Sequence, residues 1–154
     1  MTAKEMWEIF SKENNLENEE YEVWAFGDDS DKLAELTVNG IKTATCSAYY
    51  LYEKEDEELP KAGEYSVILN SRDEAVCVIK TVKVYIERFG NISEEHAYKE
   101  GEGDRSLEYW RKVHKDFFTK ELGEVGVKFS DDMELVCEEF EVVSDNDYEG
   151  GNIH

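Results

Sequence analysis

The sequence predicts a single α+β domain built around a small closed β-sheet, with helices inserted between the strands. Three observations support this prediction. Strand-like runs rich in branched and aromatic residues are scattered along the chain, helix-like segments separate these runs, and 154 residues is a usual length for one domain. We also find no internal repeat and no stretch typical of an interdomain linker.

The first half of the chain alternates between the two patterns. Apolar residues recur at helical spacing near the N-terminus, and a turn-forming stretch at residues 27–30 is suited to cap the helix that follows. Ser47 is placed to cap a short aromatic helix. The predicted elements are a helix at 4–14, a strand at 21–26, a helix ending at Asn39 and Gly40, an extended segment at 43–46, the aromatic helix at 49–52 and an acidic loop at 53–58 that ends at Pro60.

The second half begins with two strand-like runs joined by turn residues 71–74, which predict a hairpin. The second run is long for one straight strand, so we expect it to bend or bulge. Ser93 is a suitable helix cap, and glycines at 101 and 103 interrupt the helical pattern. The predicted elements are strands at 64–70 and 75–88, a helix from 93, a helix at 106–122 and a final strand at 133–143.

Composition limits the possible environment and partners. The net charge of -21 arises from 38 Asp and Glu against 17 Lys and Arg. Binding to long nucleic acids depends on cations that neutralise phosphates, so a small ligand or a short RNA is the more plausible partner. Three widely spaced cysteines indicate neither a zinc site nor a disulfide framework, and favour a reducing cytoplasm. The N-terminus is not typical of a signal peptide, and no apolar run is long enough for a membrane span.

The most informative segment is the hexapeptide GIKTAT at residues 40–45, which places Lys42 three residues before Thr45. A threonine hydroxyl becomes a nucleophile when a base lies beside it, and a lysine can be that base when burial lowers its pKa. Two simpler interpretations remain open: Lys42 as a surface cation after a helix, and Thr45 as an ordinary strand residue. In one extended segment their side chains would point to opposite faces, so a turn or bulge must separate them.

Five stretches of this sequence resemble the ASCH domain family, and in particular its YhfF-like bacterial branch. They cover roughly residues 20–143, in order and at plausible spacing. The matching stretches are WAFGD at 24–28, KTAT at 42–45, LPKAGE at 59–64, EGEGDRSL at 100–107 and DMELVCE at 132–138.

The resemblance implies a PUA-like β-barrel over residues 20–143 with a cleft for RNA or a modified nucleoside. Outside this range we expect an N-terminal helical extension at 1–19 packed on the domain, and a disordered tail at 144–154, because the tail is polar and rich in glycine. One small bacterial branch of the family consists of amidohydrolases that remove the acyl group of N4-acetylcytidine. Their lysine, threonine and glutamate correspond here to Lys42, Thr45 and Glu100. This chain is longer than those hydrolases, with an added N-terminal helix and an insertion at 101–122.

Other candidate residues have both a functional and a structural interpretation. Trp24, Tyr49 and Tyr50 either stack on a base in the cleft or pack in the core. Arg105 either pairs with the acidic loop beside it or clamps a phosphate or carbonyl. Glu100 is either catalytic or one more acid at a helix end. His96 and His114 are expected to be structural or exposed, and no zinc-deaminase or phosphate-loop motif is present.

Three functions therefore remain open at this point. The first is amide hydrolysis on an acyl nucleoside, in which Lys42 is the base, Thr45 is the nucleophile and Glu100 holds a proton for the leaving amine. The second is a binding module without chemistry, and the third is a ribonuclease that uses Lys42 with a tyrosine or Ser47. We expect no cofactor and no metal. The sequence does not give the oligomeric state.

Overall fold

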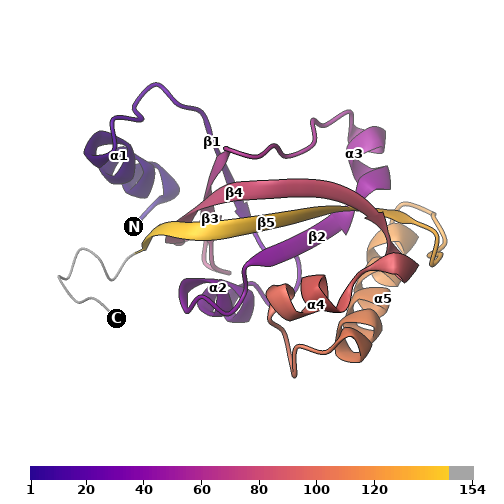
Figure 1. Ribbon diagram of the computed structural model, residues 1–154. Coiled ribbons are helices and arrows are strands. Elements are labelled where there is room, and N and C mark those ends of the chain that lie inside the picture. The colour runs from indigo at the N-terminus through magenta and orange to yellow at the C-terminus, as the bar shows by residue number, and fades with distance from the viewer. Residues whose placement is uncertain (146–154) are drawn as a thin grey trace.

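The computed structural model describes residues 1–145 of the chain. In this range it forms a five-stranded sheet with helices around it (Figure 1). The strands are β1 (Tyr21–Ala25), β2 (Ala44–Ala48), β3 (Tyr65–Leu69), β4 (Ala75–Arg88) and β5 (Glu134–Asp145). The helices are α1 (Ala3–Glu13), α2 (Ser30–Val38), α3 (Tyr49–Glu55), α4 (Glu94–Glu100) and α5 (Leu107–Gly123), with a 3₁₀ turn at Phe89–Asn91. The predicted α+β class is confirmed.

The sheet is mixed and has the strand order β1-β3-β4-β5-β2. β1 pairs parallel with β3, and the other pairs are antiparallel. The sheet curls into a half-barrel but is not closed as expected, since β1 and β2 are its two edges and do not pair with each other within residues 1–145. The predicted bulging of β4 is confirmed, because its register with β5 shifts at Val78/Ile79 and at Thr81/Lys83.

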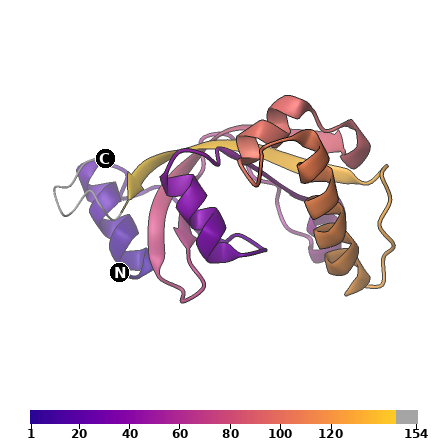
Figure 2. The ribbon, with the colours of Figure 1, turned by 90° about the horizontal axis from the view of Figure 1, so that it is seen from below.

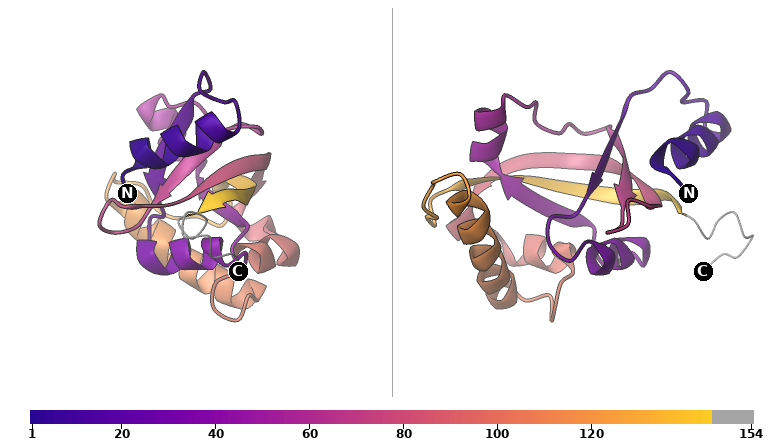
Figure 3. Two further views of the ribbon diagram at one scale, coloured as in Figure 1. Left: turned by 90° about the vertical axis from the view of Figure 1, so that its left-hand side faces the viewer. Right: turned by 180° about the vertical axis from the view of Figure 1, so that it is seen from behind.

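Helices cover both sides of this curled sheet. α2, α4 and α5 lie on the side that faces the viewer in Figure 2, and the two views in Figure 3 place α1 and α3 at opposite ends of the other side. α1 buries Met6, Trp7 and Phe10 against β3 and β4. Two further apolar clusters lie under the remaining helices, one centred on Phe118 and Trp110, the other containing Phe26 and Phe140.

Most predicted helix starts are confirmed. Asp29 and Ser93 cap α2 and α4 through their side chains, as the turn residues suggested. The predicted cap at Ser47 is wrong. Ala48 is the residue before α3, and Ser47 lies in β2, where its hydroxyl shares a hydrogen bond of 2.9 Å with the hydroxyl of Tyr52.

The end of the chain differs in part from the expected tail at 144–154. Ser144 and Asp145 belong to β5 and pair with Val78 and Cys77 of β4, because the pairing of the two long strands continues beyond the register shift at Val78/Ile79. Residues 146–154 of the expected tail lie outside the described residues. Within residues 1–145, each helix is too short or too polar to cross a membrane.

Candidate functional site

The buried carboxylate of Glu100, at the end of α4, lies at the centre of the candidate site. The residue is 1% exposed, and its two oxygens face four nitrogen donors. Oε2 accepts from His96 Nε2 at 2.7 Å and from Trp110 Nε1 at 2.9 Å. Oε1 lies 3.2 Å from Lys42 Nζ and 3.3 Å from His114 Nε2. Such complete pairing is what allows an ionised carboxylate to remain in a protein interior.

The Lys42 amine is equally buried and is held by oxygens. Its Nζ donates to the carbonyl oxygen of Ala44 at 2.9 Å and to that of Glu100 at 3.4 Å, besides the Glu100 carboxylate. It also lies 3.5 Å from Glu102 Oε2. Within residues 1–145, the hydroxyl of Thr45 is not among its hydrogen-bond partners. These contacts describe an ammonium ion rather than a free amine.

The chain conformation around Lys42 explains how it reaches Glu100. Lys42 precedes β2 and lies outside the strand, so the alternation that would separate it from Thr45 does not apply. α4 ends at Gly101, whose φ of +77° is in the left-handed region. A Cβ atom there would lie 2.6 Å from the carbonyl oxygen of Ile41. Glycine at this position therefore lets the end of α4 pack directly against the segment that carries Lys42.

The hydrogen bonds of His114 determine its protonation state. Its Nδ1 lies 2.8 Å from the carbonyl oxygen of Trp110 and must donate to it. Nε2 can then donate to Glu100 only if the ring is doubly protonated. Burial lowers the pKa of His114. The charge and hydrogen bond of Glu100 and the charge of Glu102 together outweigh this effect, so that the pKa of His114 is raised overall. His114 is thus a second cation beside Glu100.

The same neighbours decide the charge of Glu100. Burial alone raises the pKa of a carboxyl group. The charges of Lys42 and His114, with hydrogen bonds from His114 and His96, overcome this effect and hold the pKa of Glu100 well below its usual value. Glu100 is therefore an anion at neutral pH. The role expected for it from the sequence, to hold a proton for a leaving amine, does not fit this environment.

Three potential metal ligands meet next to this cluster. One ligand atom each of Cys46, Glu100 and His114 lies within 4.8 Å of the other two. These groups fit a metal ion poorly. Burial, followed by the charge of Glu100, raises the pKa of the Cys46 thiol well above its usual value, whereas a metal binds the thiolate. Lys42 already supplies positive charge to the carboxylate.

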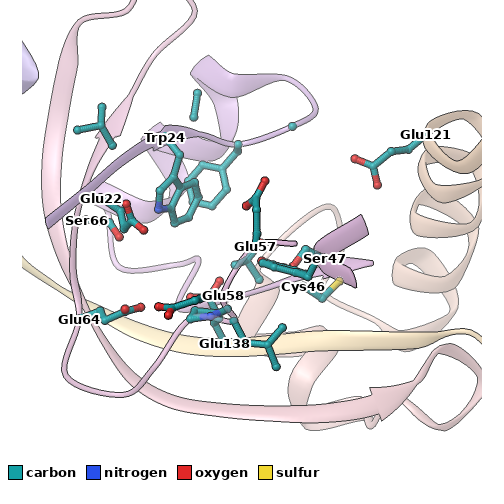
Figure 4. A pocket seen from close by; sticks show the side chains of 18 of the residues that line it. Glu22, Trp24, Cys46, Ser47, Glu57, Glu58, Glu64, Ser66, Glu121 and Glu138 are labelled. Atoms are coloured by element: carbon teal, nitrogen blue, oxygen red, sulfur yellow. The ribbon is translucent and has the colours of Figure 1, made fainter. Parts of the chain in front are cut away.

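Two neighbouring cavities, which share four lining residues, lie beside the buried cluster. The larger has a volume of about 420 Å³ and receives residues from both edge strands, among them Trp24 from β1 and Ser47 from β2 (Figure 4). The smaller, of about 70 Å³, is lined by Lys42 and Glu100. Both are lined by Thr45. The larger cavity thus lies at the open seam of the half-barrel, next to the smaller cavity that Lys42 lines.

The larger cavity is strongly acidic. Among the described residues that line it there is no Lys or Arg, while six are glutamates: Glu22, Glu57, Glu58, Glu64, Glu121 and Glu138. Burial and the neighbouring charge of Glu64 raise the pKa of Glu138 to about 7, although the Thr81 hydroxyl, which hydrogen-bonds to it, acts in the opposite direction. A carboxyl group that carries a proton part of the time at neutral pH therefore lines this cavity.

The structure brings only some of the candidate residues together. Trp24, Ser47 and Thr45 line the larger cavity, and Lys42, Thr45 and Glu100 line the smaller one. Neither cavity is lined by the other candidates, which are Tyr49, Tyr50 and Arg105.

Tyr50 lies in α3 and is 42% exposed. Arg105 makes no ion pair within residues 1–145. Its guanidinium lies 3.6 Å from the centre of the Tyr98 ring and donates to the carbonyl oxygens of Tyr98 and Ile41. Arg105 therefore braces the loop after α4.

Sequence reasoning missed several residues of the site. His96 and His114, expected to be structural or exposed, are buried donors to Glu100. His96 lies four residues before Glu100, and His114 lies four residues after Trp110, which is the spacing of one helix face. This spacing of four residues was the feature of the sequence that could have identified the two histidines as members of the site. Glu64 and Glu138 lie in the family-like stretches at 59–64 and 132–138, but neither Tyr52 nor the cavity glutamates had a comparable signal in their spacing, since acidic residues occur throughout the chain.

A curled half-barrel with inserted helices and a cavity at its open seam defines a PUA-like domain. A model of the ASCH domain family matches residues 22–144. The crystal structure of protein EF3133 from Enterococcus faecalis V583, from the DUF984 family model, is 39% identical, with a TM-score of 0.87 over 98% of this chain and 94% of that one. The ASCH domain from Lactobacillus crispatus JV V101 is 35% identical, with a TM-score of 0.75 over 80% of this chain and 82% of that one.

A third solved structure, of hypothetical protein PH0355, shares the fold at 18% identity, with a TM-score of 0.52 over 80% of this chain and 98% of that one. Among curated proteins, none matches this chain. The chain belongs to the ASCH domain family, which confirms the resemblance and the PUA-like fold expected from it. Domains of this family are PUA-like domains of the RNA-binding type.

Removing the Lys42 charge should destabilise the protein strongly. In the variant Lys42→Met the Glu100 carboxylate loses its closest full positive charge, and breaking a buried pair in this way costs about 3–5 kcal/mol. Urea unfolding measures the change. The matched control is Lys99→Met, because Lys99 pairs with Glu95 and Glu139 near the surface and should contribute less than about 1 kcal/mol. Equal losses in the two variants would contradict a buried pair at Lys42.

The contribution of His114 to stability should depend on pH. Its pKa in the folded protein is raised above the unfolded value of about 6.5. The stabilisation is therefore fully present below pH 6.5 or so and is lost as the pH rises through the folded pKa. The difference in unfolding free energy between wild type and His114→Gln, measured from pH 5 to pH 9, should shrink with rising pH. A constant difference would show that the ring does not gain a proton on folding.

Proposed function

We propose that this protein binds an unphosphorylated nucleoside in the cavity between β1 and β2 and hydrolyses an N-acyl group from it. N4-acetylcytidine is the substrate that we would test first. The observation that supports this proposal most strongly is the cavity itself, which combines an aromatic side chain, carboxylates and a threonine hydroxyl. Its volume of about 420 Å³ is in the usual range for small-molecule sites.

The charge of the cavity argues for a ligand without phosphate. The glutamates repel anions, and Lys42 is already paired with Glu100 and Glu102. A phosphate would enter this region without a counter-ion, whereas a nucleobase can stack on Trp24 and donate N–H groups to carboxylates. The same argument counts against an RNA strand as substrate, and so against the ribonuclease alternative with Lys42 and Ser47.

The proposed chemistry begins at Thr45, which lines both cavities. Its Oγ would attack the acyl carbon, and the carbonyl oxygen would become an oxyanion. The Lys42 ammonium is suited to stabilise this charge, because its long contact with Glu102 can be exchanged for one with the oxyanion. We therefore assign Lys42 an electrostatic role in place of the base expected from the sequence. Glu100 would hold Lys42 and His114 in position.

The variant Thr45→Ala tests the nucleophile. If Thr45 attacks the acyl carbon, the variant should lower kcat/KM for acetate release from N4-acetylcytidine by at least about 1,000-fold, because the chemical step is lost. Thr43→Ala is a matched control, since the Thr43 hydroxyl faces the carbonyl oxygen of Lys99 at 3.4 Å and lines neither cavity. Full activity of Thr45→Ala would overturn the mechanism.

A comparison of ligands with and without phosphate tests the binding mode. Calorimetry should give a Kd for cytidine at least about 10-fold lower than for cytidine 5′-monophosphate, and one that hardly changes between 50 and 300 mM salt. The reverse preference, with an affinity that falls steeply as salt rises, would support the alternative of a non-catalytic module that binds RNA through phosphates.

A further inference from the structure

The proposed hydrolysis needs a group that removes the proton of Thr45, and neither residue expected to handle protons is free to do so. The Lys42 amine donates to four oxygen atoms of Ala44, Glu100 and Glu102, as an ammonium ion does. Glu100 accepts from four donors and remains an anion. Any proton acceptor must therefore be another residue that lines the cavity.

We propose that Glu138 is this residue: its carboxylate accepts the proton of Thr45 Oγ and delivers it to the departing amine. This inference rests on the proposed hydrolase function. It assigns the proton-transfer role to a strand residue on β5, which the sequence did not single out, and removes that role from Glu100.

The strand register supports the assignment. β2 and β5 are antiparallel, and Thr45 lies directly opposite Glu138. Side chains of directly opposed residues leave the sheet on the same face, with their Cβ atoms about 4.5–5.5 Å apart. Both residues line the larger cavity, and Figure 4 shows Glu138 on the strand that forms one wall of it. The two groups are thus neighbours on the surface that a ligand would contact.

The surroundings of Glu138 favour a carboxyl group that gains and loses a proton near neutral pH. Glu64, just before β3, and Glu58, in the loop before it, line the same cavity. From α3, Tyr52 is close enough for the charge of Glu138 to act on its hydroxyl, and from β4 the Thr81 hydroxyl hydrogen-bonds to Glu138. The raised pKa of Glu138, about 7, agrees with this environment and is well matched to acid–base catalysis.

The two half-reactions balance with water as the only co-reactant. In the first, Thr45 Oγ bonds to the acyl carbon, its proton moves to Glu138, and the C–N bond breaks as Glu138 returns the proton to the amine nitrogen. In the second, water attacks the acyl-threonine ester and gives a proton to Glu138. Glu138 then protonates the departing Thr45 oxygen, and the carboxylic acid leaves.

The variant Glu138→Gln tests this assignment by rate and by pH profile. With N4-acetylcytidine as substrate, kcat/KM should fall at least about 100-fold, and the limb of the wild-type profile near pH 7 should disappear. Glu139→Gln is the matched control, because the Glu139 carboxylate pairs with Lys99 and lines neither cavity. The Glu139→Gln variant should retain the wild-type kcat/KM and its change with pH near pH 7.

The outcomes separate this inference from the hydrolase proposal. An active wild type with an unimpaired Glu138→Gln variant overturns the role of Glu138 and leaves the hydrolase in place. A wild type that releases no acetate overturns both. If Glu138→Gln is inactive because it is unfolded, ¹³C NMR of wild-type carboxyl groups decides: the Glu138 signal should titrate near pH 7 and shift its midpoint when cytidine binds. A Glu138 signal that ignores cytidine overturns the inference.

Discussion

The structure depends on one buried charge, the carboxylate of Glu100. An ionised carboxylate in an interior is tolerated only when donors surround it, and here they come from three different segments. His96 lies on α4 itself, Trp110 and His114 on α5, and Lys42 just before β2. The requirement to satisfy Glu100 therefore fixes how α4, α5 and the start of β2 pack together, and with them the position of Thr45.

The second constraint is the unclosed sheet. Because β1 and β2 remain unpaired with each other within the described residues, the half-barrel has an open seam. Its interior divides into two parts. Phe26, Ile68 and Phe140 form an apolar cluster under α2, while carboxylates and hydroxyls line the cavity near α3 and α5. The apolar part supplies packing energy, and the polar part is left for a ligand.

Local signals in the sequence predicted the elements well, and contacts between distant segments could not be predicted. Hydrophobic spacing, turn residues and the caps at Asp29 and Ser93 lie within a few positions of the helices they specify. The cap at Ser47 was wrong because pairing of β2 with β5 outweighs a local capping preference. The ion pair between Lys42 and Glu100 spans 58 positions, and no local pattern marks it.

The aromatic residues of α3 illustrate the same limit. Tyr49, Tyr50 and Tyr52 are indistinguishable by composition, yet only Tyr52 lines the cavity, because its position on the helix points it toward Ser47. The family resemblance identified Lys42, Thr45 and Glu100 as candidates, and the structure places all three around the smaller cavity. The family resemblance could not reveal the ionisation of these residues, which depends on His114 and on burial.

The most direct measurement is a crystal structure of the Thr45→Ala variant with N4-acetylcytidine. We expect the base beside Trp24 between β1 and β2, the acyl carbon next to position 45, the acyl oxygen facing Lys42 Nζ and the N4 nitrogen within reach of Glu138. A nucleoside bound outside this cavity, or one with its acyl group pointing away from position 45, would rule out the proposed site and mechanism.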